Sequence, residues 1–165
     1  MPKLLIHSNT EREVYFCTFT ICGWYHIFDR HCRFQILADC IKFFQENKGL
    51  IVFGYVFMPN HIHIIFQSSD AVEFVRDFKK WTSRAIKQDM VENEPRALEL
   101  FIDEAGEYQF WKDTNAPKII ETENFGLQKL QYIHNNPVVK GYVLRPECWK
   151  WSSANQESDI KVERI

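Results

Sequence analysis

The chain has 165 residues, of which 45% are hydrophobic and 25% charged, and its formal net charge is −2. This length fits one domain with a sizeable core, and the composition excludes a collagenous or low-complexity chain. The longest apolar runs are too short for a membrane span, and the first residues lack the apolar core of a signal peptide. The five cysteines contain no Cys-x-x-Cys pair, which is typical of reduced core residues. We therefore expect one soluble, cytoplasmic domain over residues 1–165.

The first half of the chain predicts a strand, a helix and a hairpin. Residues 14–22 alternate between two sets of side chains, which is the period of a strand. Apolar residues then recur at helical spacing from Asp29, a candidate N-cap, to Gly49. Residues 50–58 and 61–67 are rich in β-branched and aromatic residues. The Pro-Asn dipeptide between these two runs indicates a β-hairpin.

A second helix and an acidic segment follow the hairpin. The helix starts near Asp70, a candidate N-cap, and runs to about Gln88. The residues that we expect it to bury are Phe74, Val75, Phe78, Trp81, Thr82 and Ala85. Residues 91–108 contain six acidic residues and one arginine. This composition predicts a mobile acidic insertion with little pattern of its own.

The last third of the chain predicts a short strand at 118–121, a helix from about 123 to 135, and a tail over 145–165. We expect Pro137 to end the helix, because the residue before a proline avoids the α region. The tryptophans of the tail should dock on the body, and its last dozen residues should be frayed. The order β-α-β-β-α-β-α predicts an α+β fold. It indicates a ferredoxin-like (split βαβ) antiparallel sheet with helices on one face plus an added C-terminal helix.

Two histidines in the second strand of the hairpin are candidate metal ligands. Side chains two residues apart in a strand point to the same face, about 6.6 Å apart, so His61 and His63 can reach one metal ion. Ile62 would then point into the core. A His-x-His pair alone is a weak signal, and a structural or surface role explains it equally well.

Tyr132 and Asn136 are a second candidate group, on the last helix. They lie four residues apart on one side of the helix, roughly opposite the apolar stripe of Leu127, Leu130 and Ile133. Such a pair can belong to a site. Taken alone, it is better explained by a tyrosine at the rim of the core and an asparagine that caps the helix.

These residues stand in two motifs that resemble a known family. The first motif, over residues 54–66, is GYVFMPNHIHIIF, and the second, over residues 132–143, is YIHNNPVVKGYV. In this order and spacing they resemble the single-tyrosine HUH transposases, and within them the REP-associated tyrosine transposases. The resemblance extends over nearly the whole chain and includes Trp111 and the segment WKWSS in the tail.

The resemblance implies a ferredoxin-like domain that nicks and rejoins single-stranded DNA beside a hairpin. By the family pattern, His61 and His63 bind a divalent metal ion, and Tyr132 is the nucleophile that becomes linked to a 5′-phosphate. Asn136 takes the place of the third metal ligand, where some relatives have glutamine. The implied cofactor is Mg²⁺ or Mn²⁺, which suits mixed nitrogen and oxygen ligands. The implied partner is single-stranded DNA with hairpin (palindromic) elements, no membrane is involved, and a monomer is favoured over a dimer.

One local cluster of charge supports DNA binding. Arg76, Lys80, Arg84 and Lys87 recur at helical spacing on the second helix, opposite its apolar face. They are candidate contacts for DNA phosphates. Since the chain as a whole is slightly acidic, an ordinary solvated helix face is an equal alternative for this basic stripe.

The sequence thus predicts an enzyme, a metal-dependent transposase that nicks and transfers single-stranded DNA next to a hairpin through a 5′-phosphotyrosine covalent intermediate. Two alternatives stay open. One is a domesticated, non-catalytic module that binds hairpin DNA or RNA, since this fold often serves as a nucleic-acid platform. The other is a metal-dependent phosphodiesterase that uses water. A covalent protein–DNA adduct distinguishes the transposase from both.

Overall fold

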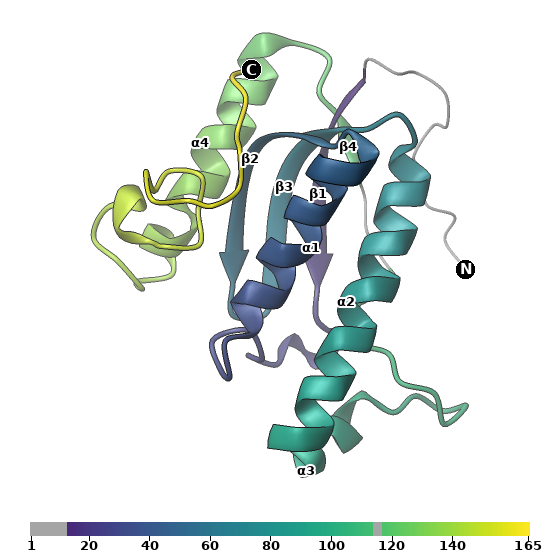
Figure 1. Cartoon of the computed structure of the whole chain (residues 1–165). Coiled ribbons are helices and arrows are strands. Elements are labelled where there is room, and N and C mark those ends of the chain that lie inside the picture. Colours follow the sequence, from purple (N-terminus) through teal and green to yellow (C-terminus); the bar gives the residue numbers. More distant parts are fainter. Residues whose placement is uncertain (1–12, 114–116) are drawn as a thin grey trace.

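The computed structural model describes residues 13–113 and 117–165 (Figure 1). Its strands are β1 (Val14–Thr20), β2 (Ile51–Met58), β3 (His61–Gln67) and β4 (Lys118–Ile119). Its helices are α1 (Arg33–Lys48), α2 (Ala71–Asn93), α3 (Pro95–Leu98) and α4 (Glu123–Val139), with 3₁₀ turns η1 (Cys22–Trp24), η2 (Glu99–Phe101) and η3 (Pro146–Cys148). Apart from the short α3, this is the predicted order of strands and helices. In the described ranges, no helix is long and apolar enough to cross a membrane.

The strands form one antiparallel sheet in the order β2-β3-β1-β4. α1 joins β1 to β2, and β3 lies between these two strands. α2 joins β3 to β4, and β1 lies between those two. Each β-α-β unit is therefore split by a strand of the other unit, which confirms the predicted ferredoxin-like topology.

The alternation of side chains along β3 gives the two faces of the sheet different contents. α1 and α2 cover one face of the sheet (Figure 1). Ile62, Ile64 and Phe66 point to this face and belong to the main hydrophobic core. His61 and His63 point to the other face. α4 packs on that second face, next to β2, where a smaller apolar cluster forms. The predicted helices on one face and added C-terminal helix are therefore both present.

α4 packs closely on β2 because β2 has a glycine at the point of contact. A Cβ atom at Gly54 would lie 2.3 Å from Cδ1 of Leu130 and 3.3 Å from Cδ1 of Ile133. Any side chain here would push the helix or its leucine away from the sheet. Gly54 therefore helps to set the distance between α4 and the sheet, and with it the position of Tyr132.

The tail covers the outer edge of β2. The Phe57 N–H donates to the Trp151 carbonyl (2.8 Å), and the Ser153 N–H donates to the Tyr55 carbonyl (2.9 Å). Trp151 and the other tail tryptophan pack against the main core, as predicted. The predicted fraying of the last residues is wrong, because the Glu163 N–H donates to a carbonyl of β2 (2.8 Å). An edge strand offers unpaired backbone groups, and the tail satisfies them.

α1 begins at Arg33, later than its predicted start after Asp29. His31 and Cys32 have left-handed backbone conformations, with φ of 49° and 58°, and they keep the helix from starting earlier. The fully buried Arg33 donates from Nη1 to the Ile27 carbonyl (3.1 Å). The contacts of the buried Arg33 side chain therefore determine the residue at which α1 starts.

α2 continues to Asn93, past the predicted end at Gln88. Its buried stripe extends in steps of four through Ile86 and Met90. Trp81, which we expected in the core, lies beside this stripe and is 41% exposed. The periodicity therefore identified the helix, but it wrongly assigned Trp81 to the buried face, next to the buried Thr82.

The acidic segment over residues 91–108 is packed against the body, contrary to the expectation of a loose insertion. Leu98 and Phe101 belong to the main core. Glu94 pairs with Arg30 and with the buried Arg33, both at 2.7 Å. The acidic composition therefore reflects, in part, the need to neutralise a buried arginine.

Candidate active site

β3 places two buried histidines side by side on the α4 face of the sheet. The ring centroids of His61 and His63 are 4.9 Å apart. Ile62 between them is fully buried in the main core. The two imidazoles therefore lie close enough to share one ligand, which is the geometry expected from the His-x-His spacing.

Asn60 and Thr18 hold the two imidazoles in place. The Asn60 Nδ2 donates to the Trp24 carbonyl (3.1 Å), so its Oδ1 accepts from His61 Nδ1 (2.7 Å). His61 then carries its proton on Nδ1 and presents the lone pair of Nε2. His63 Nδ1 lies 2.7 Å from Thr18 Oγ1, which can accept the same kind of bond. Histidines that ligate metals are oriented by such bonds on their second nitrogen.

Both histidines are neutral at pH 7. Burial lowers the pKa of His61 to about 4; the charge of Lys140 adds to this shift and the Asn136 side chain opposes it. Burial likewise lowers the pKa of His63 to about 3, with smaller contributions from His61 and Lys129. The neutral imidazole is the form that binds a metal ion, so no proton has to leave at this pH.

α4 places Tyr132 next to His63. Their ring centroids are 5.5 Å apart, and the tyrosine is 53% exposed. Phe16 of β1 stacks on His63 (5.6 Å) and meets the edge of Tyr132 (6.4 Å). Lys129, one turn earlier on α4, holds its Nζ 5.5 Å from the centre of the Tyr132 ring. An accessible phenol beside two histidines and a cation is suited to attack a phosphate group.

Asn136 lies one helical turn after Tyr132 and is buried near His61. Its Oδ1 atom is buried and has no hydrogen-bond partner within the described part of the chain. A buried oxygen of this kind is costly unless a donor or cation satisfies it. Among the described residues, no cluster of three or more His, Cys, Asp or Glu could hold a metal ion. Two imidazole nitrogens and one amide oxygen are nevertheless a donor set that fits Mn²⁺ and accommodates Mg²⁺.

The helix that carries these residues does not end at Pro137. α4 continues to Val139, so Asn136 keeps its helical position relative to Tyr132. The proline lies in the last turn, where it removes only one backbone hydrogen bond. The Lys140 N–H still donates to the Asn136 carbonyl (3.0 Å) and closes the turn. The preference of pre-proline residues for extended backbone is thus overridden in this turn.

The buried side of α4 also differs from the prediction. Ile133 is fully buried, whereas Leu127, expected in the same stripe, is about half exposed. Asn136 shares the buried side with Ile133 instead of lying opposite it. His134 binds Ser153 Oγ through Nε2 (2.7 Å) and so connects α4 to the tail.

A groove of about 450 Å³ adjoins Tyr132. It is lined by Gln128, Gln131, Tyr132, Asn135, Asn136, Val139 and Lys140. The amide side chains can each donate and accept hydrogen bonds, and the lysine adds a positive charge. Polar groups that could contact a nucleic-acid strand therefore surround the tyrosine.

Sequence reasoning missed Thr18, Asn60 and Lys129. Asn60 directly precedes the histidine pair, and Thr18 is paired with His63 in the register of β1 and β3. The polar side of β1 could have indicated Thr18, but only once the register was known. Lys129 could have been found from its spacing of one turn from Tyr132.

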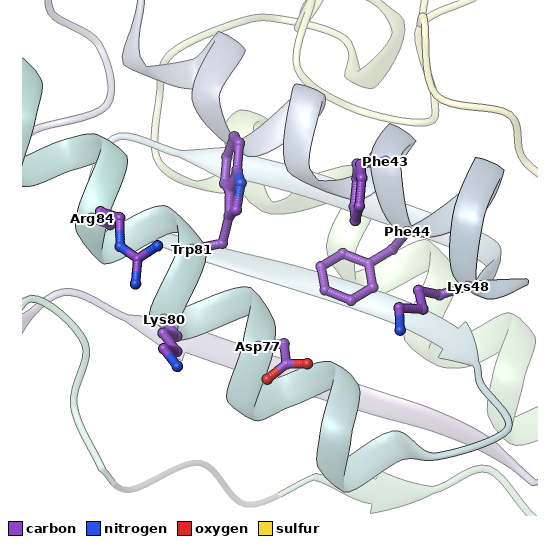
Figure 2. Close-up of a pocket in the computed structure, with 7 residues that line it drawn as sticks. All are labelled: Phe43, Phe44, Lys48, Asp77, Lys80, Trp81 and Arg84. Carbon is purple, nitrogen blue, oxygen red and sulfur yellow. The ribbon is translucent and has the colours of Figure 1, made fainter.

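The predicted basic stripe of α2 lies away from this site, because α2 covers the opposite face of the sheet. Arg76 pairs with Asp77 (2.8 Å), and Lys87 Nζ lies 4.3 Å from the centre of the Tyr108 ring. Lys80 and Arg84, the other two members of the stripe, line a groove between α1 and α2 (Figure 2). The structure therefore brings together the histidines, the tyrosine and the asparagine, but not the stripe.

Comparison with known proteins identifies a family and a similar fold. Residues 15–136 match the family described as IS200-like transposases. A comparison with curated protein sequences finds no match. Among solved structures, the chain is similar to the REP-associated tyrosine transposase bound to a REP hairpin, with a TM-score of 0.70, 17% identity, and coverage of 100% of this chain and 99% of that one. A putative transposase from Deinococcus radiodurans R1 also matches, with a TM-score of 0.42, 16% identity, and coverage of 79% and 95%.

Proposed function

Since the chain belongs to the family of IS200-like transposases, we propose that it nicks single-stranded DNA next to a hairpin and transfers the strand through a 5′-phosphotyrosine intermediate, with the help of a divalent metal ion. One observation carries the proposal. An exposed tyrosine lies against two buried, neutral histidines and near a buried amide oxygen that has no hydrogen-bond partner among the described residues. The hairpin partner is inferred from the solved REP-associated tyrosine transposase, which is bound to a REP hairpin.

His61 and His63 would hold the ion through Nε2, and Asn136 would hold it through Oδ1. A bound Mg²⁺ or Mn²⁺ would supply Lewis-acid chemistry, polarising the scissile phosphodiester and offsetting the negative charge that develops during cleavage. Three supports favour these ligands: the neutral state of both histidines, the hydrogen bonds on their Nδ1 atoms, and the unpaired amide oxygen.

Tyr132 would act as the nucleophile. Its hydroxyl oxygen forms a bond to phosphorus while the bond from phosphorus to the 3′-oxygen breaks. The phenol proton leaves, and the departing 3′-oxygen takes up a proton to become a hydroxyl. The DNA on the other side of the nick stays on Tyr132 as a 5′-phosphodiester. Attack by another 3′-hydroxyl reverses these steps and joins the strands, so no nucleotide cofactor is needed.

The residues around Tyr132 would position the strand. Lys129 and Lys140 place positive charge on either side of the tyrosine along α4, where it attracts phosphate groups. Gln128, Gln131 and Asn135 line the adjoining groove, where their amides can hydrogen-bond to the edges of unpaired bases. These contacts support single-stranded DNA as the substrate at the nick.

A gel assay for a covalent adduct tests the proposal. The probe is a single strand with a hairpin, labelled at its 3′ end, because the 3′ segment is the one that should remain on the protein. With Mn²⁺, the wild-type protein should give a labelled band that survives denaturation, and EDTA should abolish it. Tyr132→Phe should give no adduct while hairpin binding stays within a few fold.

The same assay separates the alternatives. A non-catalytic binding module would bind the probe but leave it uncut. A phosphodiesterase that uses water would cut the probe without an adduct, and Tyr132→Phe would not affect it. An adduct that persists in Tyr132→Phe would overturn the assignment of the nucleophile.

A further inference from the structure

A second groove lies between α1 and α2 (Figure 2). These helices cover one face of the sheet, and α4, which carries Tyr132, lies on the other (Figure 1). Its volume is about 290 Å³, and it is lined by Phe43, Phe44, Lys48, Asp77, Lys80, Trp81 and Arg84. Nothing in the proposed reaction uses these residues. The groove combines exposed aromatic rings with positive charge.

Two aromatic side chains stand partly in solvent at this groove. Phe43 of α1 is 49% exposed and Trp81 of α2 is 41% exposed. Figure 2 shows them rising from the two neighbouring helices toward the same space. Phe44 lies deeper, buried in the main core. Two large rings are therefore available to a flat apolar partner, and the core supports the helices that carry them.

The charge of the groove is positive. Lys48, Lys80 and Arg84 are exposed, and within the described residues none of them forms an ion pair. The groove has one acidic residue, Asp77, which is paired with Arg76 at 2.8 Å. Hydrogen bonding to Arg76 lowers the pKa of Asp77, and the charges of Lys80 and Lys48 contribute. Three cations therefore face one acidic residue that is already paired, and the net charge of the groove is positive.

We propose that this α1–α2 groove binds single-stranded DNA, with an unpaired base stacked against Trp81 and Phe43. The neighbouring phosphates would lie at Lys48, Lys80 and Arg84. Stacking platforms flanked by cations are the usual means of holding a single strand without reading its sequence. In a duplex the faces of the bases are covered by their neighbours, so an unpaired segment fits this groove and a hairpin stem does not.

The proposal retains only part of the predicted basic stripe of α2 as a DNA contact. It rests on the proposed function in one respect, namely that the ligand is DNA. Lys80 and Arg84 belong to the groove, whereas Arg76 and Lys87 are engaged elsewhere. The groove and Tyr132 lie on opposite faces of the sheet. The groove would therefore hold a segment of DNA other than the one that is cut.

Photocrosslinking locates the binding directly. Ultraviolet light is applied to the wild-type protein mixed with an oligothymidine of twelve nucleotides, and the adducts are mapped after digestion with trypsin. Trp81 falls in the peptide over residues 81–84, and Phe43 falls in the peptide over residues 43–48. We expect crosslinked nucleotides on one or both. Crosslinks confined to other peptides, such as 130–140 around Tyr132, would overturn the proposal.

Binding of the same oligothymidine by fluorescence anisotropy gives an independent test. Trp81→Ala should weaken binding about fivefold or more, because one stacking contact is lost. Lys80→Gln combined with Arg84→Gln should lower the slope of log K against log salt by about 1.4, since each phosphate contact to a single strand contributes about 0.7. The matched control, Arg145→Gln with Lys161→Gln, removes the same charge elsewhere and should leave the slope unchanged. Equal slopes in the two double variants would contradict the proposal.

Adduct formation at Tyr132 distinguishes the two proposals. If the wild-type protein gives no adduct but the groove variants lose oligothymidine binding, the proposed reaction is wrong and the proposal that the groove binds DNA is supported. If the adduct forms but the groove variants bind oligothymidine as tightly as the wild type does, the proposal that the groove binds DNA is wrong. If the variants change only the sedimentation of the protein, the groove is a contact between copies of the chain and the proposal is wrong.

Discussion

The two faces of the sheet bury different kinds of residues, although they share the same strands. The face under α1 and α2 holds a continuous hydrophobic core. The face under α4 has a small apolar cluster of Phe16, Val56, Met58, Ile65 and Ile133, and beside it the buried polar residues of the candidate site. Two helices seal the first face, whereas a single helix leaves polar groups of the second within reach of a substrate. The first face holds most of the core that stabilises the fold, and the second holds the residues to which we assign the proposed chemistry.

The largest expected effect comes from removing a proposed metal ligand. His61→Ala or His63→Ala should reduce DNA cleavage by at least about 10³-fold, because each removes one of three protein ligands. The free energy of unfolding should fall by only about 1 to 3 kcal/mol, because each variant leaves the hydrogen-bond partner of one buried histidine unpaired and the main core stays intact. A cleavage assay with Mn²⁺ and a chemical denaturation curve measure the two quantities.

His134→Gln is the matched control for the histidine variants. His134 lies on α4 and binds Ser153 rather than the site, and glutamine can still hydrogen-bond there. This variant should cleave DNA within a few fold of the wild-type rate. Cleavage by His61→Ala at the wild-type rate, or wild-type cleavage in EDTA, would show that the metal assignment is wrong.

The converse experiment removes a side chain from the main core under α1 and α2. Phe78 is fully buried and contacts Phe19, Phe74 and Trp111, with ring centroids 4.9 to 5.9 Å away. Phe78→Ala should lower the free energy of unfolding by about 3 to 5 kcal/mol. The fraction that stays folded should still form the adduct, which can be measured at low temperature. A variant that is stable but inactive would contradict the division between the two faces.

Acid should destabilise the metal-free protein because His61 and His63 are buried in their neutral form on the α4 face of the sheet. Unfolded histidines have a pKa near 6.5, while burial lowers the pKa of His61 to about 4 and of His63 to about 3. As the pH falls below 6.5, the unfolded chain takes up protons that the native state excludes, so the free energy of unfolding falls until the native histidines titrate as well. At pH 5 the loss is on the order of 2 kcal/mol for each histidine.

Denaturation curves in EDTA at pH 8 and pH 5 measure this effect. His61→Gln combined with His63→Gln should lose most of the difference between the two pH values. Other groups that titrate, such as His134, are present in both proteins and cancel in the comparison. An identical pH dependence in the two proteins would show that the histidines are not buried in their neutral form.

The smallest expected effect comes from the residue that orients His61. Asn60→Ala removes the acceptor of the bond from His61 Nδ1, which is 2.7 Å long. Loss of such an orienting bond should weaken Mn²⁺ binding by about 10- to 100-fold. Titration calorimetry with Mn²⁺ measures the affinity. Unchanged affinity would mean that Asn60 serves the hairpin turn alone.

Local patterns in the sequence were sufficient to predict the elements that form the site. The period of two along β3 places His61 and His63 on the face opposite Ile62, and the spacing of one helical turn joins Tyr132 to Asn136. Periodicity contains no information, however, on how α4 sits relative to β3. The association of the tyrosine with the histidines was predicted only from the resemblance of the two motifs to a family.

The features that could not be predicted depend on contacts between residues that are distant in the sequence. α1 starts at Arg33 because its side chain is neutralised by Asp89 and Glu94 of the α2 end. The tail is ordered because β2 is an edge strand that lacks a neighbour, which follows from the strand order and not from the tail sequence. The same holds for Thr18, whose pairing with His63 requires the register of the sheet.

The central claim is that Tyr132 becomes covalently linked to the 5′-phosphate of the cut strand, and mapping the adduct tests it most directly. The adduct formed with a hairpin-bearing single strand is digested with nuclease and trypsin and analysed by mass spectrometry. Tyr132 is the single tyrosine of the tryptic peptide over residues 130–140. The account predicts a nucleotide attached through its 5′-phosphate to Tyr132 in this peptide. A nucleotide on any other residue, or cleaved DNA that carries a free 5′-phosphate and no adduct, would contradict it.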